Sequence, residues 1–195
     1  MGKIFYVMGK SSSGKDTIYK RLLERLPQLK KVVLYTTRPI RDGETDGVEY
    51  YFTTKEKLEE FRRADKLIEE RTYETVYGPW SYFTVDDGQI DLAGQNGYLM
   101  IGTLESYEKT RGYFGEDKLF PIYIEVEDGD RLLRAIERER AQKIPKYKEL
   151  CRRFLADEED FKEENLRRCG IKKRFCNDDL EVCLDEIAKA VELEL

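Results

Sequence analysis

A glycine-rich loop between an apolar run and an amphipathic run is the feature that most constrains this chain. The apolar run KIFYVM (3–8) ends at Gly9, and residues 9–15 read G-K-S-S-S-G-K. Apolar residues at helical spacing follow as far as Pro27, so the predicted order is strand, loop, helix. In that order, backbone N–H groups of the loop point toward a phosphate at the positive helix end. The pattern predicts an anion site at the end of a buried parallel strand, and therefore an α/β fold.

The position after the loop lysine departs from the usual phosphate-loop pattern. Asp16 stands where that pattern has Ser or Thr, and Thr17 comes one residue late. The usual hydroxyl binds Mg²⁺, and a carboxylate oxygen is also a ligand that this cation accepts. We therefore treat Asp16 as a candidate Mg²⁺ ligand and expect Mg²⁺ together with ATP. A glycine turn that only joins a strand to a helix is the alternative. The expected nucleotide-binding residues here are Gly9, Ser11, Ser12, Ser13, Gly14, Lys15, Asp16 and Thr17.

Strand-like and helical patterns alternate along the rest of the chain, which predicts a mostly parallel α/β sheet. The stretch from 36 to 85 differs, because it is rich in turns and holds shorter strands and a helix that Thr54 opens. We expect it to form a small subdomain inserted between core elements. The further strands are expected at 32–35, 98–102, 119–126 and 171–175, and the larger helices at 16–26, 129–142, 143–168 and 178–195.

Composition excludes several classes of protein. The chain has 195 residues and no histidine, which excludes Ser-His-Asp and Cys-His catalysis and histidine metal ligands. The net charge of −5 does not suit a nucleic-acid surface. No apolar run approaches the ~20 residues that span a bilayer, and the N-terminal pattern is not that of a signal peptide, so we expect a cytoplasmic protein without a membrane partner. The four cysteines lack C-x-x-C spacing and are expected to be free thiols; nothing in the pattern indicates an oligomeric state.

A second anion site is indicated by TTRPIRDGETDGVEYYF (36–52). Arg38 and Arg41 lie three residues apart, and Tyr50 follows. Two guanidinium groups and a phenol suit a phosphate dianion, because arginine pairs with phosphate oxygens in a bidentate manner. A solvated charged turn is the alternative. The stretch predicts a clamp for the phosphate of a second substrate.

This stretch resembles the signature of the guanylate kinase family, T-[ST]-R-x-x-[KR]-x-x-[DE]-x-x-G-x-x-Y-x-[FY], and fills every specified position. The resemblance covers most of the chain and is weakest between about 85 and 125. It implies a P-loop NTPase-type three-layer sandwich with a central parallel sheet, an inserted NMP-binding subdomain and a helical lid. Further segments that are similar to family segments are LIEE (67–70), VYG (76–78), Arg134 with Arg138, RRFLA (152–156) and NDDL (177–180). The implied parts are a core at 1–35, 86–138 and 154–195, an NMP-binding subdomain at 36–85 and a lid at 139–153.

The resemblance also implies an activity and roles for particular residues. The activity is ATP-dependent phosphorylation of GMP or dGMP by in-line transfer, so the expected partners are ATP and a GMP-like acceptor. Glu69 faces the acceptor base, where a carboxylate accepts from the ring N–H and 2-amino groups of guanine. Asn177 lies near the donor nucleotide. The acceptor phosphate is held by Arg38, Arg41, Tyr50 and Tyr77, and the transferring group is neutralised by Lys15, Arg134, Arg138 and Arg153.

The chain departs from the family pattern at positions for base and metal recognition. Leu34 and Tyr35 replace a hydroxyl, Pro79 replaces Ser or Thr, and Met100 and Gly102 stand where aspartates are expected. Two alternatives therefore stay open. One is a kinase for another phosphorylated acceptor such as ribose 1,5-bisphosphate, whose enzymes share a G-K-D loop. The other is a non-catalytic binding module, a kind of domain that typically loses the loop lysine and the lid arginines.

Overall fold

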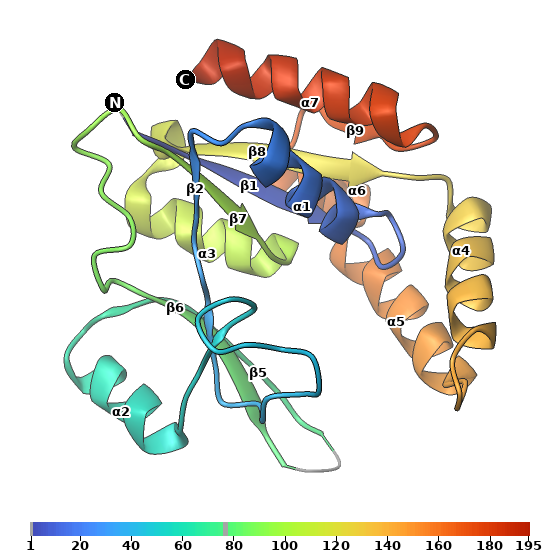
Figure 1. The fold of residues 1–195 in the computed structure, drawn as a ribbon, viewed down its shortest axis with the longest axis horizontal. Helices are drawn as coiled ribbons and strands as arrows, with labels where there is room; N and C mark the ends of the chain where they lie inside the picture. Colours follow the sequence, from blue (N-terminus) through green and yellow to red (C-terminus); the bar gives the residue numbers. More distant parts are fainter. Residues whose placement is uncertain (1, 76–77) are drawn as a thin grey trace.

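A five-stranded parallel sheet forms the centre of the computed structural model, which describes residues 2–75 and 78–195 (Figure 1). The strand order is β2-β7-β1-β8-β9, and every neighbouring pair is parallel. This order places β1 in the middle, so the loop that follows it opens at the carboxyl edge of the sheet. The strands are β1 (Lys3–Gly9), β2 (Leu29–Lys31), β7 (Gly97–Ile101), β8 (Leu119–Glu125) and β9 (Arg174–Cys176).

Helices cover both faces of the central sheet, because both faces of its strands are apolar. Along β1, Phe5 and Val7 face one core cluster, and Tyr6 and Met8 face the other, with the period of two that a strand imposes. Figure 1 shows α1 and α7 on one side and α3 on the other. The predicted three-layer sandwich is confirmed. The helices around this sheet are α1 (Lys15–Arg25), α3 (Leu104–Phe114), α4 (Asp128–Arg140), α5 (Tyr147–Asp160), α6 (Glu163–Arg168) and α7 (Leu180–Glu194), and a short 3-10 turn, η1, covers Glu116–Lys118.

A second, smaller sheet lies between β2 and β7 in the chain, in the lower left of Figure 1. Its order is β4-β3-β6-β5, and α2 (Lys55–Arg63) packs on it through Leu58. The Thr54 hydroxyl accepts a hydrogen bond from the backbone of Lys57, so the predicted N-cap is confirmed. The strands are β3 (Tyr35–Thr36), β4 (Tyr51–Phe52), β5 (Leu67–Tyr73) and β6 (Trp80–Val85).

The apolar run at 32–35 is not a strand of the central sheet, so that prediction was wrong. Strand β2 ends at Lys31, and β3 begins only at Tyr35. Between them Val33 is bonded through its backbone N–H and carbonyl to the Gln89 side chain, and the Leu34 carbonyl accepts from Tyr51. The chain here crosses from one sheet to the other, and Val32 and Leu34 are buried in the core cluster on one face of the central sheet. Burial, and not strand pairing, produces the apolar pattern.

The single long helix expected over 143–168 was also wrong, because two helices occupy this stretch. Helix α5 ends at Asp160, and α6 begins at Glu163. Phe161 between them is 6% exposed and stacks on Tyr123 of β8 with ring centroids 5.6 Å apart. The Asn165 side chain donates to the free carbonyls of Glu159 and Asp160 at the helix end. Burying the Phe161 ring therefore stabilises the fold more than continuing the charged helix through this position would.

Within residues 2–75 and 78–195, no helix has the length and apolar character that a membrane crossing requires. All four cysteines are free thiols, as expected. The described part of the chain also contains no group of three or more Cys, Asp or Glu side chains arranged to hold a metal ion.

Candidate active site

The glycine-rich loop joins β1 to α1, as the sequence predicts. Gly14 caps α1 with φ of 84°, a left-handed conformation that favours glycine, and Ser12 has φ of 65°. A Cβ on Gly14 would lie 2.4 Å from Nδ2 of Asn177, and one on Gly9 would lie 2.6 Å from the carbonyl oxygen of Ile124. Both glycines are required because neighbouring strands β8 and β9 press directly against the loop.

A cavity of about 200 Å³ opens beside the loop and is shared with α4. Arg134 and Arg138 of α4 line it together with loop residues, so the structure brings these predicted arginines to the predicted phosphate site. The hydroxyls of Ser12 and Ser13 are buried and have no hydrogen-bond partner among the described residues. Unpaired buried hydroxyls are costly, which fits a site that a polar ligand completes. The lining residues are Ser12, Gly14, Asp16, Thr17, Arg134 and Arg138.

Asn177 fixes the relative positions of the loop and the α4 arginines. It is 5% exposed, and its amide donates to the Ser13 carbonyl over 2.8 Å. Its own backbone carbonyl accepts from Arg134 over 2.9 Å. Asn177 therefore acts on the predicted nucleotide site by holding its parts, because both of these bonds are made within the protein.

Lys15 and Asp16 stand at the start of α1. The Lys15 ammonium is 3.4 Å from an Asp16 carboxylate oxygen, which is too long for a strong ion pair. The Asp16 side chain is 79% exposed at the mouth of the cavity, whereas the Lys15 side chain is 22% exposed. An exposed carboxylate next to a phosphate site has the donor type that Mg²⁺ prefers, so Asp16 fits a metal ligand.

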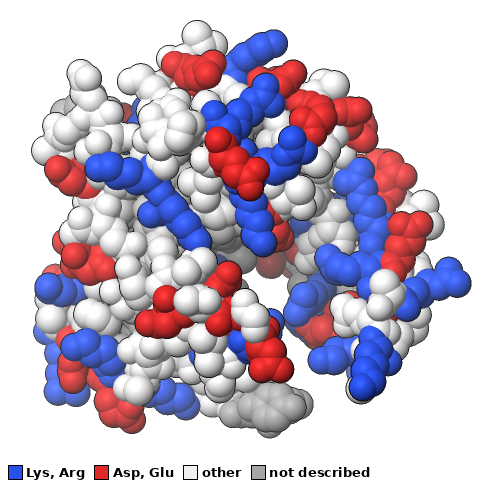
Figure 2. Space-filling view, viewed as in Figure 1, with Lys and Arg blue, Asp and Glu red and all other residues white. Residues whose placement is uncertain are grey.

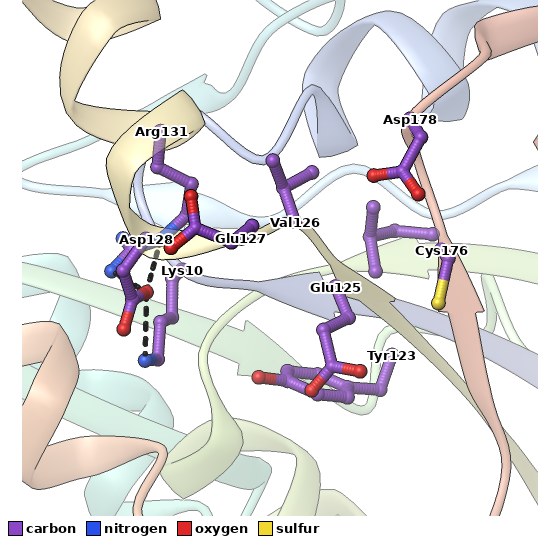
Figure 3. Close-up of a pocket in the computed structure, with 10 residues that line it drawn as sticks. Lys10, Tyr123, Glu125, Val126, Glu127, Asp128, Arg131, Cys176 and Asp178 are labelled. Carbon is purple, nitrogen blue, oxygen red and sulfur yellow. Dashed lines mark hydrogen bonds and ion pairs between the residues drawn. The ribbon is translucent and has the colours of Figure 1, made fainter.

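Carboxylates of α5 bind the loop and α4, which the sequence analysis missed. The Ser11 backbone N–H donates to Asp157 over 2.7 Å, and the Lys10 ammonium donates to Glu158 over 2.7 Å. Arg131 of α4, which is 1% exposed, donates to Asp128 and Glu158. Figure 3 shows Lys10, Asp128 and Arg131 at one end of a separate cavity of about 410 Å³, bonded to one another. The signal in the sequence was the acidic run at 157–160, which follows RRFLA (152–156) directly.

The two arginines of the predicted acceptor clamp differ in their surroundings. Arg38 is buried and donates to both Glu44 oxygens over 3.0 and 2.7 Å, and its guanidinium lies 5.7 Å from the Tyr50 ring centre. This pairing lowers the Glu44 pKa and raises the Arg38 pKa. Glu44 also accepts from the Arg41 backbone N–H over 2.9 Å, which orders the turn. The Arg41 side chain is exposed and has no ion pair within the described residues, so it is available to a ligand.

Tyr50 lies beside Arg38 in the predicted clamp. Burial raises the pKa of its phenol, and the charges of Arg38 and Arg71 oppose that rise. Figure 2 shows a deep hollow between the lobe of the smaller sheet and the lobe of α4 and α5. The structure therefore places the clamp and the loop on facing sides of one cleft.

Glu69 lies on β5 and is already occupied. Its side chain is fully buried, and its oxygens accept from Arg71 over 2.9 and 3.3 Å and from Thr84 over 2.8 Å. Burial raises the Glu69 pKa, and Arg71 lowers it in part. The sequence analysis did not identify Arg71. The available signal was its spacing, because residues two apart on a strand share one face.

Two further residues were predicted to belong to the site. Arg153 on α5 is 57% exposed and donates to Glu149 over 2.8 Å, so the structure does not bring it to the loop. Tyr77 lies outside the described residues.

Comparison with known proteins supports the resemblance that the motifs show. The guanylate kinase family model matches residues 1–85. A guanylate kinase of Salinibacter ruber is 30% identical over 177 residues, which are 90% of this chain and 88% of that protein. The chain belongs to the guanylate kinase family. A guanylate kinase of Symbiobacterium thermophilum is 38% identical over 100 residues, or 51% of this chain, but the match spans only 45% of that relative.

A crystal structure of guanylate kinase from Anaplasma phagocytophilum has the same fold. The TM-score is 0.64 at 20% identity, and the match covers 99% of this chain and 86% of that one. The predicted family and fold class are confirmed.

The departures from the guanylate kinase pattern have a structural reason at Gly102. A Cβ there would lie 2.3 Å from the Tyr6 hydroxyl and 2.6 Å from the Ser106 hydroxyl. The Tyr6 phenol, which donates to Ser106 over 2.7 Å, takes up the room that a side chain at 102 would need. Met100 is fully buried in the core. The aspartates of the family pattern are therefore replaced by packing, not by other ligands.

Proposed function

We propose that this protein transfers the γ-phosphoryl group of ATP to the phosphate of GMP or dGMP. The proposal is supported by the positions of the loop and the predicted clamp, which lie on facing sides of one hollow (Figure 2). The loop with Lys15 and the α4 arginines suits the donor, and the clamp with Arg41 suits the acceptor phosphate. The names of the relatives, guanylate kinases, support GMP as the acceptor. The retained loop lysine and α4 arginines speak against a non-catalytic binding module.

In-line phosphoryl transfer needs orientation and neutralisation of charge more than it needs a strong base, so the absence of histidine is no obstacle. In the proposed mechanism Lys15, Arg134 and Arg138 neutralise the transferring group. Arg41 and Tyr50 hold the acceptor phosphate in line. The expected division is a core, an acceptor subdomain at 36–85 and a lid at 139–153 that closes, excludes water and brings Arg153 inward. Bound Mg²⁺ would neutralise phosphate charge, with Asp16 holding it directly or through water.

Replacing Asp16 with alanine, which offers no oxygen ligand, is expected to raise the Mg²⁺ concentration for half-maximal rate by about tenfold, the effect typical of a lost metal-binding contact. The carboxylate is exposed at the cavity mouth, so its loss changes the ligand set without removing packing. Initial rates at fixed ATP over a Mg²⁺ series measure the effect, and Asp16→Glu, which keeps a carboxylate, is the control. An alanine variant with an unchanged Mg²⁺ profile would show that Asp16 has no role at the metal.

A second candidate acceptor is favoured by the occupied Glu69. The Glu69 carboxylate, which Arg71 and Thr84 already engage, binds guanine only if Arg71 is displaced, whereas a phosphorylated acceptor without a base, such as ribose 1,5-bisphosphate, needs no such displacement. A coupled ADP-release assay with GMP, dGMP, AMP, UMP and ribose 1,5-bisphosphate tests both candidates. GMP or dGMP is expected to give the highest kcat/KM. If ribose 1,5-bisphosphate ranks first, the second candidate replaces the first, and if no acceptor stimulates ADP release, the enzyme proposal is wrong.

A further inference from the structure

Glu69 and Arg71 form a buried ion pair at the place where the acceptor base is expected. The Arg71 side chain is 7% exposed and the Glu69 side chain is fully buried. Arg71 presents its Nε and one terminal nitrogen to the two carboxylate oxygens, while its other terminal nitrogen donates to Thr103 over 3.2 Å. Thr103 follows β7 and caps α3, so Arg71 reaches from the smaller sheet to the core. A guanidinium therefore fills the space between Glu69 and the core.

The guanidinium offers Glu69 the same donors that a guanine base would offer. A guanine edge carries a ring N–H beside an amino N–H, and both lie in one plane. Arg71 carries two coplanar N–H groups in the same arrangement, and such a fork suits a carboxylate in a bidentate manner. Only one of the two can occupy this carboxylate at a time.

We propose that Arg71 is an internal competitor of the acceptor base for Glu69, and that displacing it sets the acceptor selectivity. The inference rests on the proposed function and deepens it. A base that presents two adjacent donors replaces the guanidinium at Glu69, whereas a base with one donor or none replaces it poorly. Arg71 is in this sense a specificity-determining residue that acts through Glu69.

Burial raises the pKa of the Glu69 carboxyl, and neighbouring groups act in the other direction. The Thr84 hydroxyl on β6 donates to Glu69, and the Lys109 ammonium on α3 lowers the Glu69 pKa. The buried Tyr6 phenol on β1 faces the same pair and is neutral at ordinary pH. Tyr73, two residues beyond Arg71 on the same strand, is 45% exposed and feels the charge of Arg71.

Competition of this kind raises the apparent Kd of GMP, because the base binds only to those molecules whose Glu69 carboxylate is free. The apparent Kd equals the intrinsic Kd divided by the fraction of such molecules. The bidentate ion pair keeps Glu69 bound to Arg71 in most molecules. Removal of Arg71 is therefore expected to lower the Kd of GMP about tenfold or more. Because the gain depends on donors of the base, it is expected to be smaller for IMP, which lacks the 2-amino group, and absent for AMP. A merely structural role of Arg71 would not produce this order.

Calorimetric titration of GMP, IMP and AMP into the full chain at pH 8 tests the proposal. The variants are Arg71→Ala, Glu69→Gln and the double substitution. Arg62→Ala removes an exposed arginine that pairs with Glu70 nearby and serves as the matched control. Arg71→Ala is expected to lower the Kd of GMP, and the double variant is expected to lose that gain. Arg71→Lys, which cannot offer two coplanar donors, is expected to lie between wild type and alanine, and it decides the question if the alanine variant does not fold.

The proposal is overturned if Arg71→Ala binds GMP no more tightly than wild type, including the case in which neither binds measurably. It is equally overturned if IMP and AMP gain as much as GMP, or if Glu69→Gln leaves the gain intact. Turnover by the wild-type protein tests the proposed function separately. A wild type without GMP turnover beside an Arg71→Ala variant that binds GMP would refute the activity and support the competition.

Discussion

Replacing Lys15 with alanine is expected to reduce kcat by about 10³-fold, as loss of one preorganised charged donor to a developing charge does in other enzymes. Lys15 is the first residue of α1, between Gly14 and Asp16, which line the cavity together with Arg134 and Arg138. Its ammonium has only a long contact to Asp16, so no strong ion pair has to break before it meets a phosphate. The lost rate is expected mainly in kcat, because the charge matters most where the transferring group is neutralised.

Single-turnover and steady-state rates with ATP and GMP measure this effect. Lys20→Ala is the matched control, because Lys20 is an exposed lysine of the same helix and lies outside the cavity lining. That variant is expected to keep wild-type rates. Retention of more than about a tenth of kcat by Lys15→Ala would contradict the assignment of the loop as the donor site.

Replacing Arg41 with alanine is expected to raise the KM for the acceptor by about 100-fold and to leave the KM for ATP unchanged. Each hydrogen bond to a charged group contributes about 1.5–3 kcal/mol, and a bidentate contact to phosphate combines two of them. The turn itself is expected to remain in place, because the Arg41 backbone N–H, and not its side chain, is bonded to Glu44. Arg38 pairs with Glu44 in either case, so the fold of the clamp does not depend on the Arg41 guanidinium.

Initial rates over a GMP series at saturating ATP give the KM values. Arg63→Ala on α2 is the matched control, because Arg63 is an exposed arginine of the same lobe that lies outside the clamp. An Arg41→Ala variant with wild-type GMP kinetics would show that the acceptor phosphate binds elsewhere.

At the predicted acceptor site, the sequence motif identifies the residues but does not show whether they are buried or paired with other side chains. The motif at 36–52 predicted a clamp, but its arginines have different surroundings, since Arg38 is buried against Glu44 and only the Arg41 side chain is exposed. Glu69 was expected to face a base, yet it is buried against Arg71. Whether two side chains form such an ion pair depends on their relative positions in the folded chain. A motif specifies the type of residue at each position, and it does not specify which residues contact one another.

By itself the sequence determined the phosphate-binding loop, the alternation of strands and helices, and the arginine pair on α4. These features follow from short-range spacing, because glycine conformation, helical period and strand period are local properties. Only the tertiary structure decided the break at Phe161, the crossing of 32–34 between two sheets, the contact of Asp157 with the loop and the pairing of Glu69 with Arg71. Each of these joins segments that lie on different elements or takes its energy from burial, and burial is a property of the folded chain as a whole.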